Sequence, residues 1–257
     1  MQSSLSLPLG FILGFLLVLV RLSGVFIFIP LPGIKEGPQV ARIVLAVAVT
    51  LAMFPWWPAV DMAGFDIVRL TGWMFSEAAL GITVGLGVAF VTEALVLAAQ
   101  IAGLQAGYAY ASVVDPNTQA DSSVLLVISQ LLASLLFFAI GLDREVVRIF
   151  ARSLIAHPPG TFRLTPAITE QILRLGSDLF ATGLRLALPV VALLALVDIS
   201  LALLGRINAQ LQLLTLAFPV KMMAALLLLA WLAALFPSVY RSHATAILGP
   251  AGAIVAR

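Results

Sequence analysis

Long apolar runs constrain the fold of this chain more than any other feature of its sequence. The first run extends from Leu9 to about Leu31, and only Arg21 interrupts it. A helix needs about 20 apolar residues to cross roughly 30 Å of hydrocarbon, so this run predicts a membrane-spanning helix. No Lys or Arg precedes it and no small-residue cleavage pattern follows it. We therefore expect an uncleaved helix and not a secretory signal.

Five further apolar runs follow the first. They extend from about Val40 to Val60, Gly72 to Tyr110, Val124 to Leu142, Leu179 to Leu204 and Leu211 to Phe236. The third contains no proline and no basic residue and is longer than one bilayer thickness, so it is either one protruding helix or two helices that meet at a glycine. The sequence therefore predicts an all-α fold of integral-membrane helical hairpins, with about six hydrophobic segments in one domain, residues 1–257.

The composition excludes several classes of function. Hydrophobic residues make up 62% of the chain and charged residues 10%, against about 45–50% and 25% in soluble domains. A soluble enzyme of this composition would expose large apolar patches to water. The net charge of +2 forms no basic stripe, so nucleic acid is not an expected partner. With no cysteine and only two histidines, His157 and His243, the sequence predicts no enzyme, no metal site and no cofactor.

Glycines and polar residues recur at helical spacing along the third run. Glycines four residues apart let helix backbones approach closely, and a carboxylate that faced lipid would cost several kcal/mol. These faces should therefore turn toward protein or a water-filled lumen. Their function is either a conduit or ion site, or a polar clamp between packed helices, and we favour the clamp. The set comprises Glu77, Gly81, Gly85, Glu93, Gln100, Gly103 and Gly107.

Four charges lie within or beside other apolar runs, and we expect them to be buried: Arg21, Asp198, Arg206 and Lys221. Asp198 and Lys221 are about equally far from the polar turn at 205–210, so in an antiparallel hairpin they would reach similar depth and could pair. Such a pair could serve a proton relay or simply hold the hairpin together. We favour the structural interpretation.

The connection between the third and fourth runs is rich in small and turn-forming residues. It carries two acids and no base, and Asp115-Pro116-Asn117 has strong turn chemistry. The simplest interpretation is a solvated hairpin connection. The distribution of Lys and Arg among the other loops gives the orientation, because the 143–176 segment and the tail collect most of them. The positive-inside rule then places the C-terminus in the cytoplasm.

At this loop the sequence resembles the FliR family of flagellar biosynthesis proteins and their type III secretion counterparts. The resemblance covers nearly the whole chain, although each motif alone is only moderately specific. The matching residues are Arg21, Pro30-Leu31-Pro32-Gly33, Arg42, Glu77, Gly81, Gly85, Ala99-Gln100 through Gly107, Val113-Val114-Asp115-Pro116, Ile128-Ser129-Gln130, Leu135-Leu136-Phe137, Gly183-Leu184, Ala187-Leu188-Pro189, Leu203-Leu204-Gly205-Arg206 and Phe218-Pro219-Val220-Lys221. Two turns depart from the family pattern, at Ala209-Gln210-Leu211-Gln212 and at Gly141-Leu142-Asp143.

The resemblance implies a non-catalytic subunit of the type III protein export gate in the bacterial inner membrane, at the flagellar basal body. It implies assembly with FliP and FliQ into a pore for unfolded export substrates, with FlhB, FlhA and membrane lipid as further partners. Residues 1–176 would be FliP-like, 177–236 a FliQ-like hairpin and 237–257 a cytoplasmic-side tail. The hairpins would sit largely above the membrane plane. A plug loop in the lumen would comprise Ser112, Val113, Val114, Asp115, Pro116, Asn117 and Thr118.

Two other classes of function compete with this one. A secondary transporter should show inverted repeats with paired broken helices, whereas Pro189 and Pro219 both lie in the C-terminal runs and no matching half precedes them. A purely structural scaffold would tolerate a shorter loop without added leak. The sequence does not distinguish flagellar from virulence-type secretion.

Overall fold

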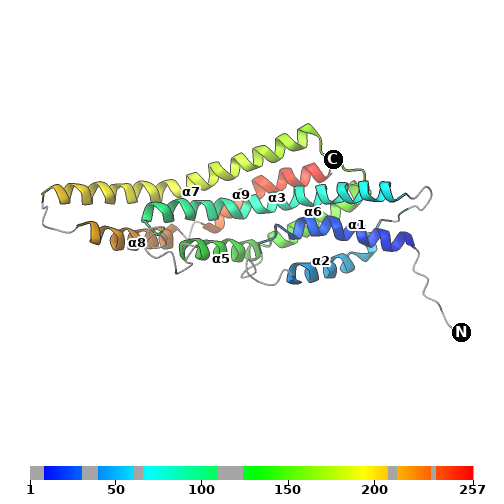
Figure 1. Cartoon of the computed structure of the whole chain (residues 1–257), viewed down its shortest axis with the longest axis horizontal. Helices are drawn as coiled ribbons and strands as arrows, with labels where there is room; N and C mark the ends of the chain where they lie inside the picture. Colours follow the sequence, from blue (N-terminus) through cyan, green and yellow to red (C-terminus); the bar gives the residue numbers. More distant parts are fainter. Residues whose placement is uncertain are drawn as a thin grey trace. The chain divides into compact units, whose positions relative to one another are not determined.

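The structure is a computed structural model that describes residues 9–30, 40–58, 60, 66–108, 124–207, 213–232 and 236–256. Within these ranges the chain is helical and contains no strand, which confirms the predicted all-α fold (Figure 1). Its elements are α1 (Leu9–Phe26), α2 (Val40–Ala52), the short 3₁₀ helix η1 (Phe54–Trp56), α3 (Ile67–Ala106), α5 (Val124–Ala139), α6 (Leu142–Ala156), α7 (Pro166–Ile207), α8 (Leu213–Leu232) and α9 (Phe236–Ala256).

The chain divides into two compact units. Unit 1 comprises Met1–Phe90, Gly141–Leu175 and Ala244–Arg257, and unit 2 comprises Val91–Ile140 and Gly176–His243. The helices α3, α7 and α9 each contribute residues to both units.

The third apolar run forms one helix, so the first of its two alternatives is correct. Helix α3 has 40 residues, or about 60 Å at 1.5 Å per residue. It ends at Gly107, whose φ of 89° is left-handed. The N–H of Gly107 donates to the Leu104 carbonyl and that of Tyr108 to the Gly103 carbonyl, each at 3.1 Å. Gly107, which the sequence grouped with the packing glycines, thus lies just past the helix end and caps it.

Three described helices are long and apolar enough to cross a membrane, namely α1, α3 and α7, or up to four spans if one consecutive pair counts as a single span. Among the described residues, the six predicted apolar segments therefore do not all form helices long enough to cross a membrane. The second was expected to continue to Val60, but α2 ends at Ala52 after 13 residues, only about 20 Å. Pro55, in the first turn of η1, accounts for this early end, because it has no N–H to donate to the Leu51 carbonyl and its ring crowds that carbonyl.

The C-terminal third is more helical than the sequence indicated. A span was expected to begin at Leu179, after the basic 143–176 segment, yet α7 begins at Pro166 and continues as a single 42-residue helix. The lone Gly176 within it is tolerated, since an interior glycine costs only about 1 kcal/mol relative to alanine. The expected tail at 237–257 contains α9, which the sequence analysis missed.

Within unit 1, α1 packs beside α2 (Figure 1). An aromatic cluster fixes the end of this pair: the Trp57 ring lies 5.6 Å from Phe11, 5.1 Å from Phe15 and 5.1 Å from Phe54, centroid to centroid. The indole N–H of Trp57 donates to the Thr50 carbonyl at 2.8 Å. This cluster covers the chain reversal after α2.

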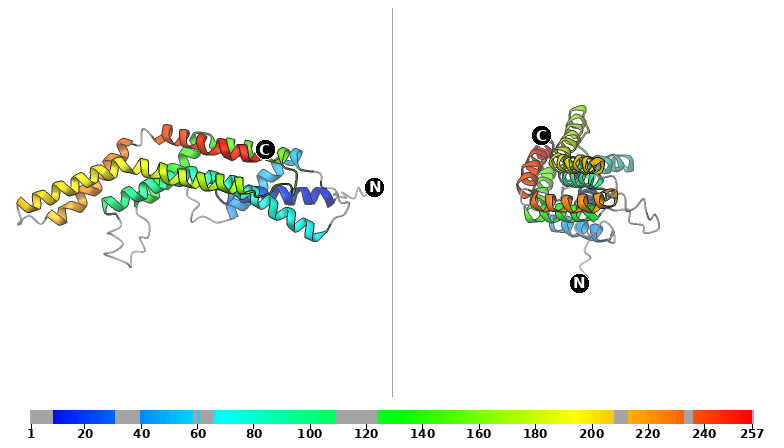
Figure 2. Two further views of the ribbon diagram at one scale, coloured as in Figure 1. Left: turned by 90° about the horizontal axis from the view of Figure 1, so that it is seen from above. Right: turned by 90° about the vertical axis from the view of Figure 1, so that its left-hand side faces the viewer.

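Within unit 2, α8 runs alongside the C-terminal part of α7, in orange and yellow in the left view of Figure 2. Together they form a helical hairpin. Each helix contains an interior proline, Pro189 in α7 and Pro219 in α8. Each proline removes one backbone hydrogen bond from its helix.

Candidate functional site: two charge networks and close helix contacts

A buried ion pair lies at the centre of unit 1. Arg21 in α1 and Glu77 in α3 are each only 1% exposed, and Arg21 Nε lies 2.5 Å from Glu77 Oε2. The guanidinium also donates from Nη1 to Ser153 Oγ at 3.1 Å and from Nη2 to the His157 carbonyl at 2.9 Å. The other Glu77 oxygen accepts the Gly160 N–H at 3.2 Å. One network therefore joins α1, α3 and the turn after α6.

The turn after α6 packs closely against α3, next to the network of Arg21 and Glu77. Gly160 has a φ of 75°, and a Cβ there would lie 1.8 Å from Cδ1 of Trp73 in α3. Only glycine meets both requirements, the left-handed backbone and the close approach to the indole. Beside it, Ser76 Oγ donates to the Phe162 carbonyl at 2.8 Å. The turn is thus held against α3 at two points beyond Glu77.

The same region brings the backbones of α1 and α3 into direct contact. A Cβ on Gly81 would lie 2.0 Å from the Arg21 carbonyl oxygen, and one on Gly24 would lie 2.9 Å from the Gly81 carbonyl carbon. A Cβ on Gly85 would lie 2.8 Å from the Gly24 oxygen. Small residues four apart are the usual means of close helix packing in membrane proteins. Here they also bring Arg21 within reach of Glu77, one turn before Gly81.

A second charge network joins three helices of unit 2. Lys221 Nζ of α8 lies 2.9 Å from Oδ1 and 3.0 Å from Oδ2 of Asp198 in α7. Gln105 Nε2 of α3 donates to the same Oδ2 at 3.2 Å. The Asp198 side chain is 43% exposed and that of Lys221 13%. This pair is therefore partly open, unlike the pair of unit 1.

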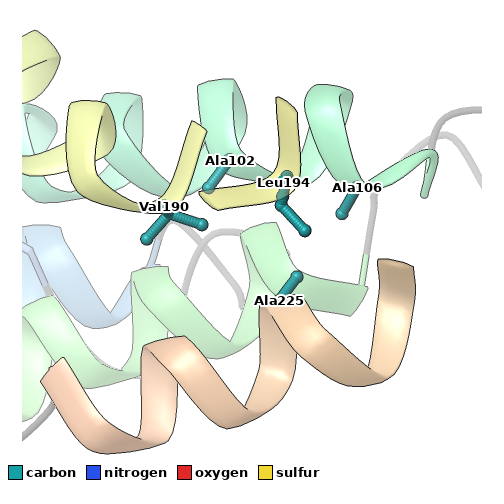
Figure 3. Packing of buried hydrophobic residues seen from close by; sticks show 5 residues of the cluster. All are labelled: Ala102, Ala106, Val190, Leu194 and Ala225. Atoms are coloured by element: carbon teal, nitrogen blue, oxygen red, sulfur yellow. The ribbon is translucent and has the colours of Figure 1, made fainter. Parts of the chain in front are cut away.

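Small apolar residues form the core beside this network. Ala102 and Ala106 of α3 meet Val190 and Leu194 of α7 and Ala225 of α8 (Figure 3). The alanines allow the three helices to approach, so that Gln105, Asp198 and Lys221 come within hydrogen-bonding distance.

The Tyr108 hydroxyl supports this arrangement at the end of α3. It donates to the Met222 carbonyl of α8 at 3.2 Å. Burial raises the pKa of Tyr108 above its ordinary value of 10.0, because the charged phenolate is poorly solvated there. The hydroxyl therefore remains a hydrogen-bond donor at neutral pH.

The structure separates the remaining predicted residues into distinct environments. Glu93 and Gln100 are exposed on α3, whereas Gly103 is buried. Arg206 is exposed in the last turn of α7. Of the four charges that the sequence grouped as buried, only Arg21 is fully enclosed among the described residues. Lys221 is 13% exposed, Asp198 is 43% exposed although it contacts α3 and α8, and Arg206 is exposed.

The proposed plug residues, Ser112 to Thr118, lie outside the described residues. No group of three or more His, Cys, Asp or Glu side chains that could hold a metal ion occurs among the described residues.

Sequence reasoning missed several members of both networks. Gly24 lies three residues after Arg21, so helical spacing could have placed it on the Arg21 face. Gln105 and Gly183 had weaker signals; a Cβ on Gly183 would lie 3.0 Å from the Ala94 carbonyl oxygen. Ser153 and the His157 carbonyl gave no signal, because only the tertiary fold brings them to Arg21.

These features of the described residues define a helical membrane protein with long apolar helices, close backbone contacts and internal charge networks. The chain belongs to the bacterial export proteins, family 1, whose family model matches residues 12–247.

Curated relatives agree with this membership. The flagellar biosynthetic protein FliR of Escherichia coli K12 is 29% identical over 213 residues, which cover 82% of this chain and 81% of that protein. FliR of Bacillus subtilis 168 is 26% identical over 225 residues, 84% of each chain. The Yop proteins translocation protein T of Yersinia pestis is 27% identical over 227 residues, 85% of each chain.

The buried pair of unit 1 generates a stability prediction. Arg21→Met or Glu77→Met alone leaves an uncompensated buried charge, so each should destabilise the folded protein by about 3–5 kcal/mol. The double variant should recover much of this loss. The measurement is resistance to unfolding in mixed micelles of increasing SDS content.

Arg174→Met is the matched control, since Arg174 and Glu170 form an exposed pair that should contribute at most about 1 kcal/mol. Strictly additive effects of the two Met substitutions would contradict the coupling.

The helix contact of unit 1 generates a second prediction. Gly81→Ala inserts a methyl group against the Arg21 carbonyl, which is backbone and cannot rotate away, so α1 and α3 must separate. We expect a loss of about 1–3 kcal/mol or more and a lower yield of monodisperse protein. Gly72→Ala on the same helix meets no atom within 4 Å and should be neutral or stabilising by up to about 1 kcal/mol. Equal yields from the two variants would show that the contact is not required.

Proposed function

We propose that this chain is a non-catalytic subunit of the flagellar type III protein export gate. It assembles with FliP and FliQ homologues into the pore through which unfolded flagellar substrates leave the cell, and it contacts FlhB and FlhA. Family membership and the FliR relatives support this proposal.

The observation that carries the proposal is the uncovered apolar surface of α7. Only 17% of its most apolar 18-residue window is buried within the chain, against 67% for α3. Leu184, Leu188 and Leu196 on α7 are each at least half exposed. The same helix presents the partly exposed Asp198 carboxylate. A surface that combines leucines with a carboxylate suits helices of partner subunits better than lipid alone, because Lys221 and Gln105 leave 43% of the Asp198 side chain exposed and lipid would not solvate that exposed part.

The internal organisation follows from the same proposal. Residues 1–176 form a FliP-like part, and the hairpin of α7 and α8 within 177–236 corresponds to a FliQ subunit. Residues 237–257 lie on the cytoplasmic side, in agreement with the concentration of Arg in the 143–176 segment and the tail. The apolar helices and the family membership support the bacterial inner membrane as the location.

The loop at Ser112–Thr118 acts in this proposal as a plug in the lumen of the pore. Its support is the sequence alone: small, polar, turn-forming residues are unsuited to a lipid-facing helix and belong in water or a lumen.

A virulence-type gate is the second candidate function. The relative from Yersinia pestis, whose name refers to translocation of Yop proteins, is 27% identical and supports it. Complementation separates the two systems, because a flagellar subunit should restore swimming and a virulence-type subunit should restore effector secretion.

The assembly predicts that the lone chain is less stable than the complex. When the chain is co-expressed with FliP and FliQ homologues from the same genome, native mass spectrometry should find one copy of it with several copies of the smaller partners. The complex should remain monodisperse in detergent under conditions in which the lone chain aggregates, because partner helices cover α7. Co-expression with an unrelated helical membrane protein is the control. Equal detergent stability of the lone chain and the complex would argue against the gate.

If the loop plugs the pore, shortening it should let ions or small solutes leak through. Deletion of a few residues around Asp115-Pro116 should leave the yield of complex near normal, because the loop fills the pore and contributes little to assembly. Leak of ions or small solutes, measured as conductance in planar bilayers, should rise, and export should survive at least in part. Exchange of the loop for a Gly/Ser segment of the original length is the control for loop length. No added leak from a well-assembled complex would reject the plug, and loss of the complex would make the loop a packing element.

A further inference from the structure

Unit 2 contains an apolar cavity that neither charge network uses. It has a volume of about 220 Å³ and lies among α3, α5, α7 and α8, with Phe236 of α9 at its edge. Its walls include several buried alanines, among them Ala98, Ala99 and Ala187. These short side chains leave the space that larger residues would fill.

The lining excludes water as a stable occupant. Among the described residues, no charged side chain lines the cavity. The polar lining residue is Ser129, whose hydroxyl already donates to the Leu126 carbonyl at 2.8 Å. A buried water needs about two to four polar partners, whereas an engineered cavity of about 150 Å³ with a similarly apolar lining stays dry and binds benzene or xenon. The lining therefore favours a hydrocarbon.

The opening of the cavity is also apolar. Ile128 of α5 and Leu226 of α8 line the cavity and are 49% and 41% exposed. The two side chains thus lie where the cavity meets the exterior. An occupant that enters between them passes only apolar groups, as it would from the interior of a bilayer.

A second, much smaller cavity adjoins the first and limits the length of the occupant. The two share Leu95, Leu186 and Phe236, and the smaller has a volume of about 10 Å³. It is lined in part by Tyr240, whose buried hydroxyl has no hydrogen-bond partner among the described residues. This space suits about one water molecule and is too small for a lipid headgroup, so the polar end of the occupant must remain outside.

We propose that one acyl chain of a membrane phospholipid occupies this cavity and fills the space among the four helices. The cavity selects the hydrocarbon chain and not the headgroup, because its lining offers neither charge nor a free hydrogen-bonding group. The proposal rests on the membrane location of the chain and, for its test, on the assembly proposed above. Failure of the partners to co-purify would count against the export gate, whereas an assembled complex without cavity cross-links would count against the lipid.

Photocrosslinking tests this proposal in the full chain, purified with its co-expressed partners and reconstituted with two probes. The probes are phosphatidylethanolamine and phosphatidylglycerol that carry the same diazirine-labelled acyl chain. Peptide mapping should place the cross-links on cavity-lining residues of α3 and α5, such as Ala98, Ala99 and Ser129, with equal yield from both headgroups. Ala99→Leu and Ala187→Leu fill the cavity from opposite sides. Each should lower this yield by about tenfold or more, because the added side chain occupies the same space.

Ala167→Leu is the matched control, since Ala167 is exposed at the N-terminal end of α7 and does not line the cavity, so this variant should leave the yield unchanged. If a filling variant does not assemble, the positions of the cross-links in the unmodified protein decide the question. Cross-links confined to outward-facing residues such as Leu184 and Leu188 would overturn the proposal. An undiminished cross-linking yield in an assembled filling variant would also overturn it, as would a yield that depends on the headgroup. A third contrary result is an assembled complex whose cavity residues do not react because a partner side chain fills the space.

Discussion

The buried pair of Arg21 and Glu77 is the constraint on which the packing of unit 1 depends. Two charges that are each 1% exposed are costly in an apolar interior unless geometry and additional hydrogen bonds compensate for the lost hydration. Ser153 Oγ, the His157 carbonyl and the Gly160 N–H provide those bonds. The pair therefore fixes α1, α3 and the turn after α6 in one arrangement, and its contribution is as much to uniqueness of packing as to stability.

Small residues make both charge networks possible. In unit 1, Gly24 and Gly81 bring two backbones into contact beside the ion pair. In unit 2, Ala102, Ala106 and Ala225 have the corresponding role beside Asp198 and Lys221. Larger side chains at these positions would separate the helices by more than the length of a hydrogen bond. The apolar cavity is a further consequence of small residues, because five alanines among the described residues line it, namely Ala98, Ala99, Ala102, Ala187 and Ala230.

Much of the helical fold could be predicted because apolar runs report burial or lipid contact directly. The boundaries that failed have local causes: Pro55 ends α2 early, and the single Gly176 does not interrupt α7. The charged residues Arg21, Glu77, Asp198 and Lys221 could be selected because charges are rare in such runs. The partnership of Arg21 with Glu77 could not be derived, since 56 residues separate them and no spacing rule links two different helices. The contacts of Ser153 and Gly160 with this pair could not be predicted for the same reason.

The order in which the members of the Arg21 network leave the ribosome has a consequence for biogenesis. Arg21 lies in the first helix, but its carboxylate partner is 56 residues later and Ser153 is 132 residues later. At roughly 5–20 residues per second, Glu77 is synthesised about 3–11 s after Arg21. During this interval α1 carries an unpaired guanidinium, and an arginine at the centre of a helix costs about 2.5–3.5 kcal/mol on insertion scales. Until α3 is synthesised, α1 therefore carries the cost of this charge without the carboxylate of Glu77 that compensates for it in the folded protein.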